Sequence, residues 1–397
     1  MQKGYKTELK PNNKQISMLI KHCGTARFAY NWGLNIKIKE YQETKKSPSA
    51  IDLHKILVQL KKTEFPWLYE MSKCAPQESL RNLDVAFKNF FRNIKKGRKP
   101  GFPKFKSRKK GIGSFRLTGS IKVENNRVKL PRIGWIRLKE DGYLPICNPS
   151  QITISEKAGH WFTSFAVKED KKIEKLSEET IGIDLGINKL ATLSNGEVIE
   201  NNKALKRNLK KLKRVQKSLS RKQKGSKNRK KAKRIVQRVY YRISNIRKDI
   251  IHKMTTTIVK TKPSAVVIED LNVKGMMKNR RLSKSISDCG WYEIRRQLEY
   301  KLKWIGSKLV IADRFFPSSK MCSNCCILKE DLKLSDRVFK CNVCGLELDR
   351  DYNAAINLRK LAVSSTVLAC GEIVRPLESL IPKAISVKQE FNESLNN

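Results

Sequence analysis

The sequence of 397 residues is poor in acidic side chains, since 37 Asp and Glu stand against 85 Lys and Arg for a formal net charge of +48. A free globular protein gains nothing from so much self-repulsion, so a basic protein that is merely soluble is the weaker interpretation. A membrane-surface role is weaker still, because no strongly apolar helical face accompanies the basic stretches. A polyanion would neutralise this charge and release counterions, which indicates nucleic acid as the partner.

Long apolar segments and paired histidines are also missing. No apolar run approaches the length of a membrane span, and the first residues, MQKGYKTELKPNNKQ, have no apolar core of the signal-peptide type. The four histidines form no motif such as HExxH, which argues against a His-based nuclease or zinc hydrolase. Ten cysteines, four of them in two CxxC pairs, suit a metal site in a reducing cytoplasm better than a disulfide framework. We therefore expect a cytoplasmic protein.

The N-terminal half predicts helices placed between strands. A short strand is expected at 5–9, and apolar residues then recur at helical spacing from 13 to about 95. Between 115 and 170, short runs of alternating apolar and polar residues are separated by turn residues. This second pattern predicts a small β-barrel or a half-open sheet.

The stretch KKGRKPGFPKFKSRKK, at 95–110, is basic and broken by Gly and Pro. Its cations can contact phosphates and its aromatic rings can contact bases or sugars, so we expect a nucleic-acid contact here. A boundary loop with two buried Phe anchors is the alternative. The candidate binding residues are Lys99, Phe102, Lys104, Phe105, Lys106 and Arg108.

A second basic segment, 203–248, contains 21 Lys and Arg and no Asp or Glu. Two thin apolar stripes predict two helices, with the tip of the hairpin at 220–234. A run of like charges is usually a solvated face, and KNRKKAKR also resembles a nuclear localisation signal. The complete absence of acids favours instead a surface that contacts successive phosphates. The candidate residues are Lys222, Lys227, Arg229, Lys230, Lys233 and Arg234.

Two CxxC pairs lie 15 residues apart and contribute four thiols, Cys322, Cys325, Cys341 and Cys344. Such hooks can close a tetrahedral thiolate shell around Zn²⁺, as in a ribbon. A closed shell leaves no position for substrate, so we assign it to folding and nucleic-acid contact rather than to catalysis. Cys326 follows the first pair where Gly345 follows the second, and it is either a bystander or a substitute ligand.

Three acids occupy the positions of a ribonuclease H-like arrangement. Asp184 lies in GIDLG on the first strand of a hairpin, Glu269 ends the strand AVVIE, and Asp351 begins a helix. Each alone has a plain explanation, because strand ends and helix starts commonly carry acids. Together they would meet at one place, where two Mg²⁺ ions about 4 Å apart can hydrolyse a phosphodiester. Carboxylates suit such hard cations, and substrate phosphate completes their shells.

The series of motifs resembles the TnpB family of transposon-associated RNA-guided nucleases, relatives of the compact type V CRISPR effectors. The likeness runs from Lys6 to about Leu361 and is carried by GIDLGINKLATLSNG, VVIEDLNV, FFPSSKMCSNC and CNVCGLELDRDYNAAINL, together with KTELKPNNKQ and GRKPGFPKFKSR. The joint order of these motifs is far more specific than any one of them. The departure is Cys326 in place of the usual Gly, which puts the shape of the first knuckle in doubt.

The resemblance implies a multidomain α/β protein. Its RNase H-like (RuvC) nuclease domain would carry a zinc-ribbon insertion and would be joined by a wedge β-barrel and a helical recognition lobe. The expected boundaries are 1–12 and 96–172 for the wedge, 13–95 for the recognition lobe, 173–315 and 349–362 for the nuclease, 316–348 for the ribbon and 363–397 for a flexible tail.

The same resemblance implies an RNA-guided DNA endonuclease. A guide RNA from the transposon end would direct it to double-stranded DNA beside a short motif, and one RuvC site would cut both strands. The matching catalytic acids and Mg²⁺ ligands, with Mn²⁺ as a substitute ion, are Asp184, Glu269 and Asp351. The matching Zn²⁺ ligands are Cys322, Cys325, Cys341 and Cys344. Asp270 and Asp349 adjoin the motifs but are not the selected acids, and a monomer is expected.

Other classes of protein remain open. Some relatives act as RNA-guided repressors after losing catalytic acids, whereas all three acids are present here. A transposase or a structure-specific nuclease on the same ribonuclease H-like core would act without any guide RNA. A zinc-ribbon DNA-binding factor would leave the three spaced acids unexplained.

Overall fold

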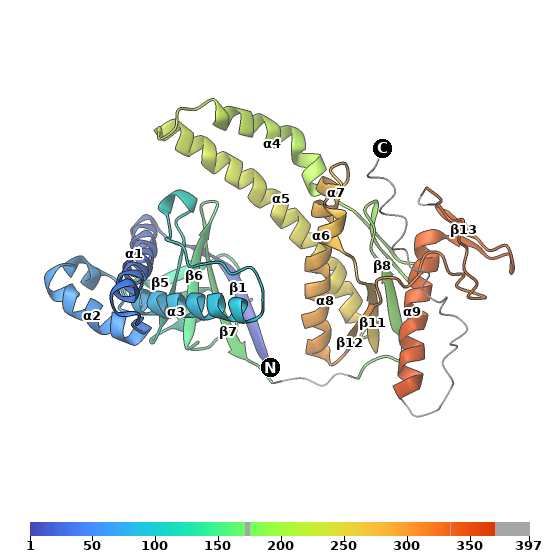
Figure 1. The fold of residues 1–397 in the computed structure, drawn as a ribbon, viewed down its shortest axis with the longest axis horizontal. Coiled ribbons are helices and arrows are strands. Elements are labelled where there is room, and N and C mark those ends of the chain that lie inside the picture. Colours follow the sequence, from blue (N-terminus) through green and yellow to red (C-terminus); the bar gives the residue numbers. More distant parts are fainter. Residues whose placement is uncertain (171–174, 334, 370–397) are drawn as a thin grey trace. The chain divides into compact units, whose positions relative to one another are not determined.

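The computed structural model describes residues 1–170, 175–333 and 335–369, and it divides into two compact units (Figure 1). The first unit holds residues 1–170 and 211–242, and the second holds residues 171–210 and the chain from residue 243 onward. Each unit has a hydrophobic core of its own.

The first unit is built on a seven-stranded antiparallel sheet with the strand order β2-β6-β7-β1-β5-β4-β3. Strand β1 lies centrally and pairs with β7 from Gln2 opposite Lys168 to Leu9 opposite Trp161. Because β2 and β3 are its two edges, the sheet is the half-open alternative that the sequence predicted. The strands are β1 (Gln2–Lys10), β2 (Ser114–Thr118), β3 (Lys122–Val123), β4 (Arg127–Leu130), β5 (Gly134–Leu138), β6 (Gln151–Lys157) and β7 (His160–Lys168).

The predicted helices between the strands are confirmed as α1 (Asn13–Thr44), α2 (Ala50–Thr63) and α3 (Cys74–Lys95), with short 3₁₀ turns η1 (Pro66–Glu70) and η2 (Arg108–Lys110). Helix α1 starts at a capping box, in which the Asn12 side chain accepts from the Gln15 amide at 2.8 Å and the Gln15 side chain accepts from the Asn12 amide. Its first half packs into the sheet core through Leu19 and Cys23. Its second half packs with α2 and α3 around Leu34 and Leu83.

The basic hairpin consists of α4 (Ala204–Ser220) and α5 (Lys227–Lys260), so its tip is 221–226. The expected tip, 220–234, was too long. Ser226 caps α5 by accepting from the Arg229 amide at 3.1 Å. The Arg229 guanidinium donates to the carbonyls of Leu219 and Lys222 at 2.9 and 2.8 Å, which closes the turn early.

The second unit contains a five-stranded sheet with the order β10-β9-β8-β11-β12. Its first three strands form an antiparallel meander, and β11 and β12 run parallel to β8. The strands are β8 (Thr180–Asp184), β9 (Lys189–Leu193), β10 (Val198–Glu200), β11 (Ala265–Glu269) and β12 (Lys308–Ala312).

Helices cover both faces of this sheet. On one face, Val266 and Ile268 of β11 pack in a core with residues of α5 and α8 (Trp291–Ile305). On the other face, Val267 packs against Leu358 of α9 (Arg350–Ala369), the helix that Figure 1 shows beside β8. This alternation along β11 is the two-residue period of a strand. The other elements are α6 (Val273–Met276), α7 (Ser283–Cys289) and the hairpin of β13 (Val338–Lys340) and β14 (Glu347–Asp349).

Helix α9 continues to Ala369, so residues 363–369, expected in the tail, extend the helix instead. The rest of the expected tail, 370–397, lies outside the described residues. Within the described ranges, no helix is long and apolar enough to cross a membrane.

Gly182, in the middle of β8, marks the place where α9 crosses the sheet. A Cβ atom on Gly182 would lie 2.0 Å from the carbonyl oxygen of Ala355 and 2.5 Å from the amide nitrogen of Arg359. Both atoms belong to the helix backbone and cannot turn aside as a flexible side chain could. The absence of a side chain at residue 182 therefore lets the helix lie directly on the strand.

We expect Gly182→Ala to destabilise the protein by at least about 3 kcal/mol, because the added methyl group forces the helix backbone away from the strand. Thermal and urea unfolding of the variant measure the loss. Gly4→Ala is the matched control, since it also lies in a strand but has no atom within 4 Å of its Cβ position. Equal stability of the two variants would show that α9 does not rest on Gly182.

Candidate active site and metal centre

The fold places Asp184 and Glu269 at the same end of two neighbouring parallel strands. Ile183 of β8 pairs with Ile268 of β11, and each acid is the residue that follows and ends its strand. Asp351 lies in the first turn of α9, the helix that crosses β8. The three predicted acids thus come from two strand ends and one helix start that converge.

The charges of these acids act on one another. Burial raises the pKa of Asp184 well above its usual range, and the neighbouring carboxylates of Glu269 and Asp351 raise it further, against the opposing charge of Arg350. Such repulsion requires the three carboxylates to lie close together. In the part of the chain that the structure describes, only the cysteines form a group of possible metal ligands within 4.8 Å of one another.

The two adjoining acids have other partners. Asp270 accepts from Arg295 at 3.2 Å and from Arg314. Asp349 caps α9 by accepting from the amides of Asp351 and Tyr352 at 3.0 and 3.2 Å. It also pairs with Lys189 at 2.8 Å. Asp270 and Asp349 are therefore held in structural contacts.

Hydroxyl and backbone groups orient two of the three acids. The hydroxyl of Ser318 donates to the Glu269 carboxylate at 2.5 Å. The Asp349 cap fixes the backbone at the start of α9, and the Asp351 carboxylate lies 3.9 Å from the guanidinium of Arg350. The sequence reasoning did not find Ser318, although it lies in the motif FFPSSK.

The four predicted cysteines converge in a ribbon that ends in the β13–β14 hairpin. Their sulfur atoms all lie within 4.8 Å of one another. The Sγ distances are 3.6 Å from Cys322 to Cys344 and 3.5 Å from Cys325 to Cys341. Four sulfurs at a Zn–S distance of 2.3 Å stand about 3.8 Å apart in a tetrahedron. The arrangement therefore fits a single structural zinc ion.

Cys326 is the turn residue of the first knuckle. Its amide donates to the carbonyl of Cys322 at 3.0 Å, and the amide of Gly345 donates to that of Cys341 at 3.1 Å. Both residues have left-handed backbones, with φ of 63° for Cys326 and 70° for Gly345. The two knuckles therefore have the same shape despite the substitution. Cys326 is outside the four-sulfur group, so the geometry makes it a bystander.

Two buried asparagines of α9 hold the ribbon against the helix, and the sequence reasoning missed both. The Asn353 side chain donates to the carbonyl of Met321 at 2.7 Å and accepts from the Ser323 amide at 2.9 Å. The Asn357 side chain donates to the carbonyls of Ser318 and Met321 at 2.8 and 2.7 Å. Their signal is a pair of polar residues at helical spacing among apolar ones, in YNAAINL.

The predicted nucleic-acid residues of the 95–110 stretch differ in availability. Phe102 and Phe105 are 47% and 53% exposed, so the alternative of two buried Phe anchors is wrong. Lys106 differs from the others, because its Nζ lies 3.8 Å from the ring centroid of Tyr30 and burial lowers its pKa. Its backbone also bonds in both directions with the Asn31 side chain. Lys106 is therefore held against α1 by Tyr30 and Asn31, although the residue remains exposed. Lys99, Lys104 and Arg108 are exposed.

The predicted residues of the basic hairpin are mostly on its surface. Arg229 is the exception, since its guanidinium closes the tip. Lys233 donates from Nζ to the carbonyl of Lys109 at 2.8 Å. The other candidates, Lys222, Lys227, Lys230 and Arg234, are exposed.

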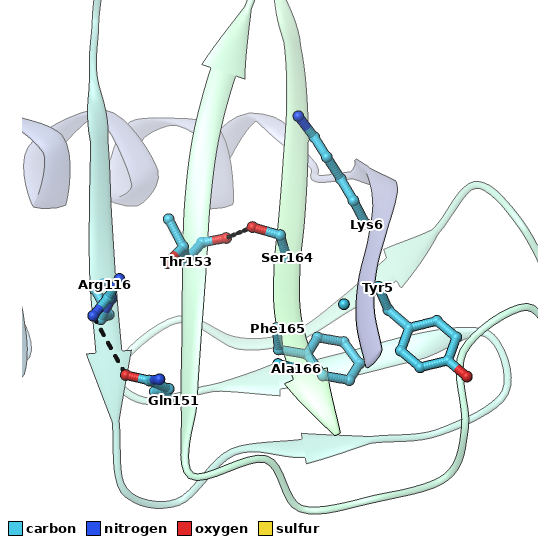
Figure 2. A pocket seen from close by; sticks show the side chains of 9 residues that line it. Tyr5, Lys6, Arg116, Gln151, Thr153, Ser164, Phe165 and Ala166 are labelled. Atoms are coloured by element: carbon cyan, nitrogen blue, oxygen red, sulfur yellow. Dashed lines mark hydrogen bonds between the residues drawn. The ribbon is translucent and has the colours of Figure 1, made fainter. Parts of the chain in front are cut away.

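The sheet of the first unit also carries a hollow of about 370 Å³ that the sequence did not predict (Figure 2). Figure 2 shows Arg116 and Gln151 joined at 3.4 Å, and the Ser164 hydroxyl donating to the Thr153 carbonyl at 3.5 Å. Lys6 also lines the hollow. These polar side chains lie on neighbouring strands, and only the strand pairing brings them together.

Family models match three stretches of the chain. The model OrfB of IS605, described as "Probable transposase", matches residues 164–280. A "Cas12f1-like, TNB domain" model matches 291–358, which contains the cysteine ribbon. A "Helix-turn-helix domain" model of the OrfB group matches 1–46, which in this chain forms β1 and the single helix α1.

Curated relatives cover nearly the whole chain. A protein of Streptomyces pristinaespiralis named "Putative RNA-guided DNA endonuclease" is 38% identical over 400 residues, which cover 98% of this chain and 96% of the relative. A protein of Escherichia coli (strain K12) named "Putative RNA-guided DNA endonuclease InsQ" is 35% identical over 396 residues, which cover 94% and 96%.

A solved structure titled "Cryo-EM structure of the Cas12f1-sgRNA-target DNA complex" matches with a TM-score of 0.52 at 17% identity, over 87% of this chain and 82% of that one. The fold is thus a mixed α/β fold of the kind found in Cas12f1, with a ribbon-like cysteine cluster. The extent of its identity to the curated relatives shows that the chain belongs to the TnpB family, which includes OrfB of IS605. The resemblance drawn from the motifs is confirmed.

We expect Asp184→Asn to stabilise the Mg²⁺-free protein at pH 7.5. The pKa of Asp184 is higher in the folded state than in the unfolded state, so this carboxyl costs stability at any pH above its ordinary value in the unfolded chain. The gain should be roughly 1 kcal/mol or more, hence at least about 1 °C in Tm. It should disappear as the pH falls below about 4, where the carboxyl is protonated in both states.

Asp349→Asn is the control of opposite sign. Burial raises the pKa of Asp349, but the bond from Lys189 and the amides of Tyr352 and Asp351 outweigh burial and lower it. Its charge stabilises the fold above the ordinary carboxyl pKa, so Asp349→Asn should lower Tm at pH 7.5 and lose this effect at low pH. A lower Tm for both variants at pH 7.5 would contradict the repulsion at Asp184.

Cys326→Gly should raise stability by about 1 kcal/mol, because a left-handed backbone is costly for a residue with a Cβ atom. Gly345→Ala in the other knuckle has no atom within 4 Å of its Cβ position and should lower stability by a similar amount. Unfolding curves and zinc analysis measure both effects. The zinc content of Cys326→Gly should equal that of the unmodified protein, and its loss would make Cys326 a ligand.

Proposed function

We propose that this protein is an RNA-guided DNA endonuclease whose cutting centre is Asp184, Glu269 and Asp351. The observation that carries the proposal is the convergence of two parallel strand ends and a helix start, with mutual repulsion raising the pKa of Asp184. The strand order β10-β9-β8-β11-β12, antiparallel and then parallel, supports a ribonuclease H-like nuclease domain of the RuvC type.

The chain's own residues suit metal-dependent phosphodiester hydrolysis. Two Mg²⁺ ions, or Mn²⁺ as a substitute, would supply an activated water and stabilise the leaving oxygen. Asp184, whose pKa is raised by the charges of both other acids, would hold the ions together with Glu269 and Asp351. The Ser318 hydroxyl donates to the Glu269 carboxylate, and the Asp349 side chain caps the first turn of α9, where Asp351 lies. These contacts limit the reorganisation needed when metal and DNA bind.

The guide RNA and the DNA target are proposed from the family and from charge. The curated relatives that cover almost the whole chain are named as RNA-guided DNA endonucleases. The formal charge of +48 matches two polyanionic partners. Base pairing between the guide and the target would recognise the DNA sequence. The exposed lysines and arginines of 95–110 and of the α4–α5 hairpin would bind the phosphate backbones of the RNA and the DNA. The protein would act as a monomer.

The parts of the chain take the roles expected of the family. The seven-stranded sheet, in 1–12 and 96–172, would be the wedge, and α1 to α3, in 13–95, the recognition lobe. The nuclease would comprise 173–315 and 349–362, with the ribbon at 316–348. The four cysteines would bind Zn²⁺ for folding, because a closed thiolate shell leaves no position for substrate.

Asp184→Ala and Glu269→Ala should each abolish cleavage of a plasmid that carries the target, while guide RNA and target binding persist. Each change removes a metal ligand and leaves the basic surfaces intact. Cleavage with Mg²⁺ and the copurifying RNA is the measurement, alongside gel-shift binding. Asp249→Asn is the control, because it alters an exposed acid of the same unit, on α5, and should cut normally.

Full cutting by either alanine variant would overturn the assignment of the acids. No cutting by the unmodified complex, with target binding intact, would make the protein an RNA-guided repressor. Strand-transfer products, or cleavage of branched DNA without RNA, would identify a transposase or a structure-specific nuclease instead.

A further inference from the structure

A pocket of about 230 Å³ opens beside Glu269 in the second unit. It lies between the end of β11 with the turn that follows and the start of α8. Its wall includes Glu269, Asn272, Lys274, Trp291, Tyr292 and Arg314. Glu269 thus belongs both to the acid cluster and to this pocket, which none of the steps above uses.

The cations of the pocket are fixed in place. Arg295 and Arg314 line it, and both donate to Asp270, the residue after Glu269. Each remains about half exposed, with side-chain exposures of 46% and 50%. The two guanidinium groups and Lys274 carry three positive charges, which outweigh the two carboxylates of Asp270 and Glu269. The pocket therefore offers an anion a preformed positive wall next to Glu269.

Tyr292 gives the pocket an exposed aromatic edge. It is 74% exposed, whereas its neighbour Trp291 is 4% exposed and closes the inner side. Pockets for small molecules usually measure about 300–1,000 Å³, so this smaller space suits one planar group. Aromatic rings beside cations are the means by which proteins hold unpaired nucleotides, whose bases have free faces. A base inside a duplex has both faces covered by its neighbours.

We propose that the pocket holds one unpaired nucleotide of the DNA strand being cut, adjacent to the scissile phosphate. The base stacks on Tyr292, and the phosphate on its outer side faces Lys274 and Arg314. The inference rests on the proposed nuclease function and deepens it, because it assigns to Tyr292 the register of the strand relative to Glu269. Tyr292 is a substrate-binding residue here and takes no part in the chemical step.

The first test is an abasic scan. Target strands carrying a single abasic site at successive positions around the cut are cleaved by the RNA-bound protein. An abasic site at one of these positions should raise KM about tenfold, which corresponds to the loss of one stacked base. Tyr292→Ala should raise KM for the intact strand by a similar factor, with kcat little changed. An abasic site at the same position should then cause no further rise in the KM of this variant. Tyr292→Phe keeps the ring and should stay within about twofold.

The matched control is Tyr300→Ala, which removes a tyrosine from the same helix but outside the pocket. It should keep the abasic profile of the unmodified protein. An unchanged profile in Tyr292→Ala, or the same profile change in Tyr300→Ala, would overturn the assignment of the pocket. Because the readout is a position-specific loss, a variant that merely folds poorly cannot imitate it.

The second test separates this inference from the nuclease function. A 2-aminopurine base at the sensitive position, or at each position in turn if no cleavage occurs, reports stacking through quenching of its fluorescence. The measurement uses the Asp351→Asn variant of the RNA-bound protein, in which the strand stays intact. Quenching that Tyr292→Ala removes supports the pocket even where cleavage fails. No difference between Tyr292 and Tyr292→Ala, or stronger quenching with an RNA strand of the same sequence, overturns it.

Discussion

The direct contact of α9 with β8 is the constraint on which both sites depend. Because Gly182 has no side chain, the backbone of the helix at Ala355 and Arg359 comes within van der Waals contact of the strand. This approach brings the start of the helix, with Asp351, to the strand end that carries Asp184. The same helix holds the cysteine ribbon through Asn353 and Asn357. One glycine thus couples the carboxylate cluster to the thiolate cluster.

The acid cluster is held together against its own charge. The pKa of Asp184 is raised by burial and by the other two carboxylates, so the metal-free fold is less stable than it would be with a neutral residue there. The adjoining acids show the contrast, since Asp270 is neutralised by Arg295 and Arg314, and Asp349 by Lys189 and amides. In the trio, Arg350 offsets only part of the repulsion at Asp184, which is the pattern expected where divalent cations complete a site.

Much of this arrangement could be predicted from the sequence, because motif spacing and periodicity encode it. The order of helices and strands, the four cysteines and the three acids follow from local patterns. The hairpin tip was drawn too long because the cap at Ser226 and the bonds of Arg229 depend on side-chain contacts. Asn353, Asn357 and Tyr292 were missed, since their roles arise only when separate elements meet. The sequence left open whether Cys326 is a zinc ligand, and only the three-dimensional grouping of the four sulfur atoms excludes it from the cluster.

The central claim is that Asp184, Glu269 and Asp351 hold the ions that cut DNA. Its most direct measurement is a structure of the guide RNA and DNA complex with Mn²⁺, in which anomalous scattering locates the ions. We expect two peaks about 4 Å apart, with Asp184, Glu269 and Asp351 as their ligands. Manganese bound elsewhere, or no peak at these carboxylates in a complex that cleaves its target, would contradict it.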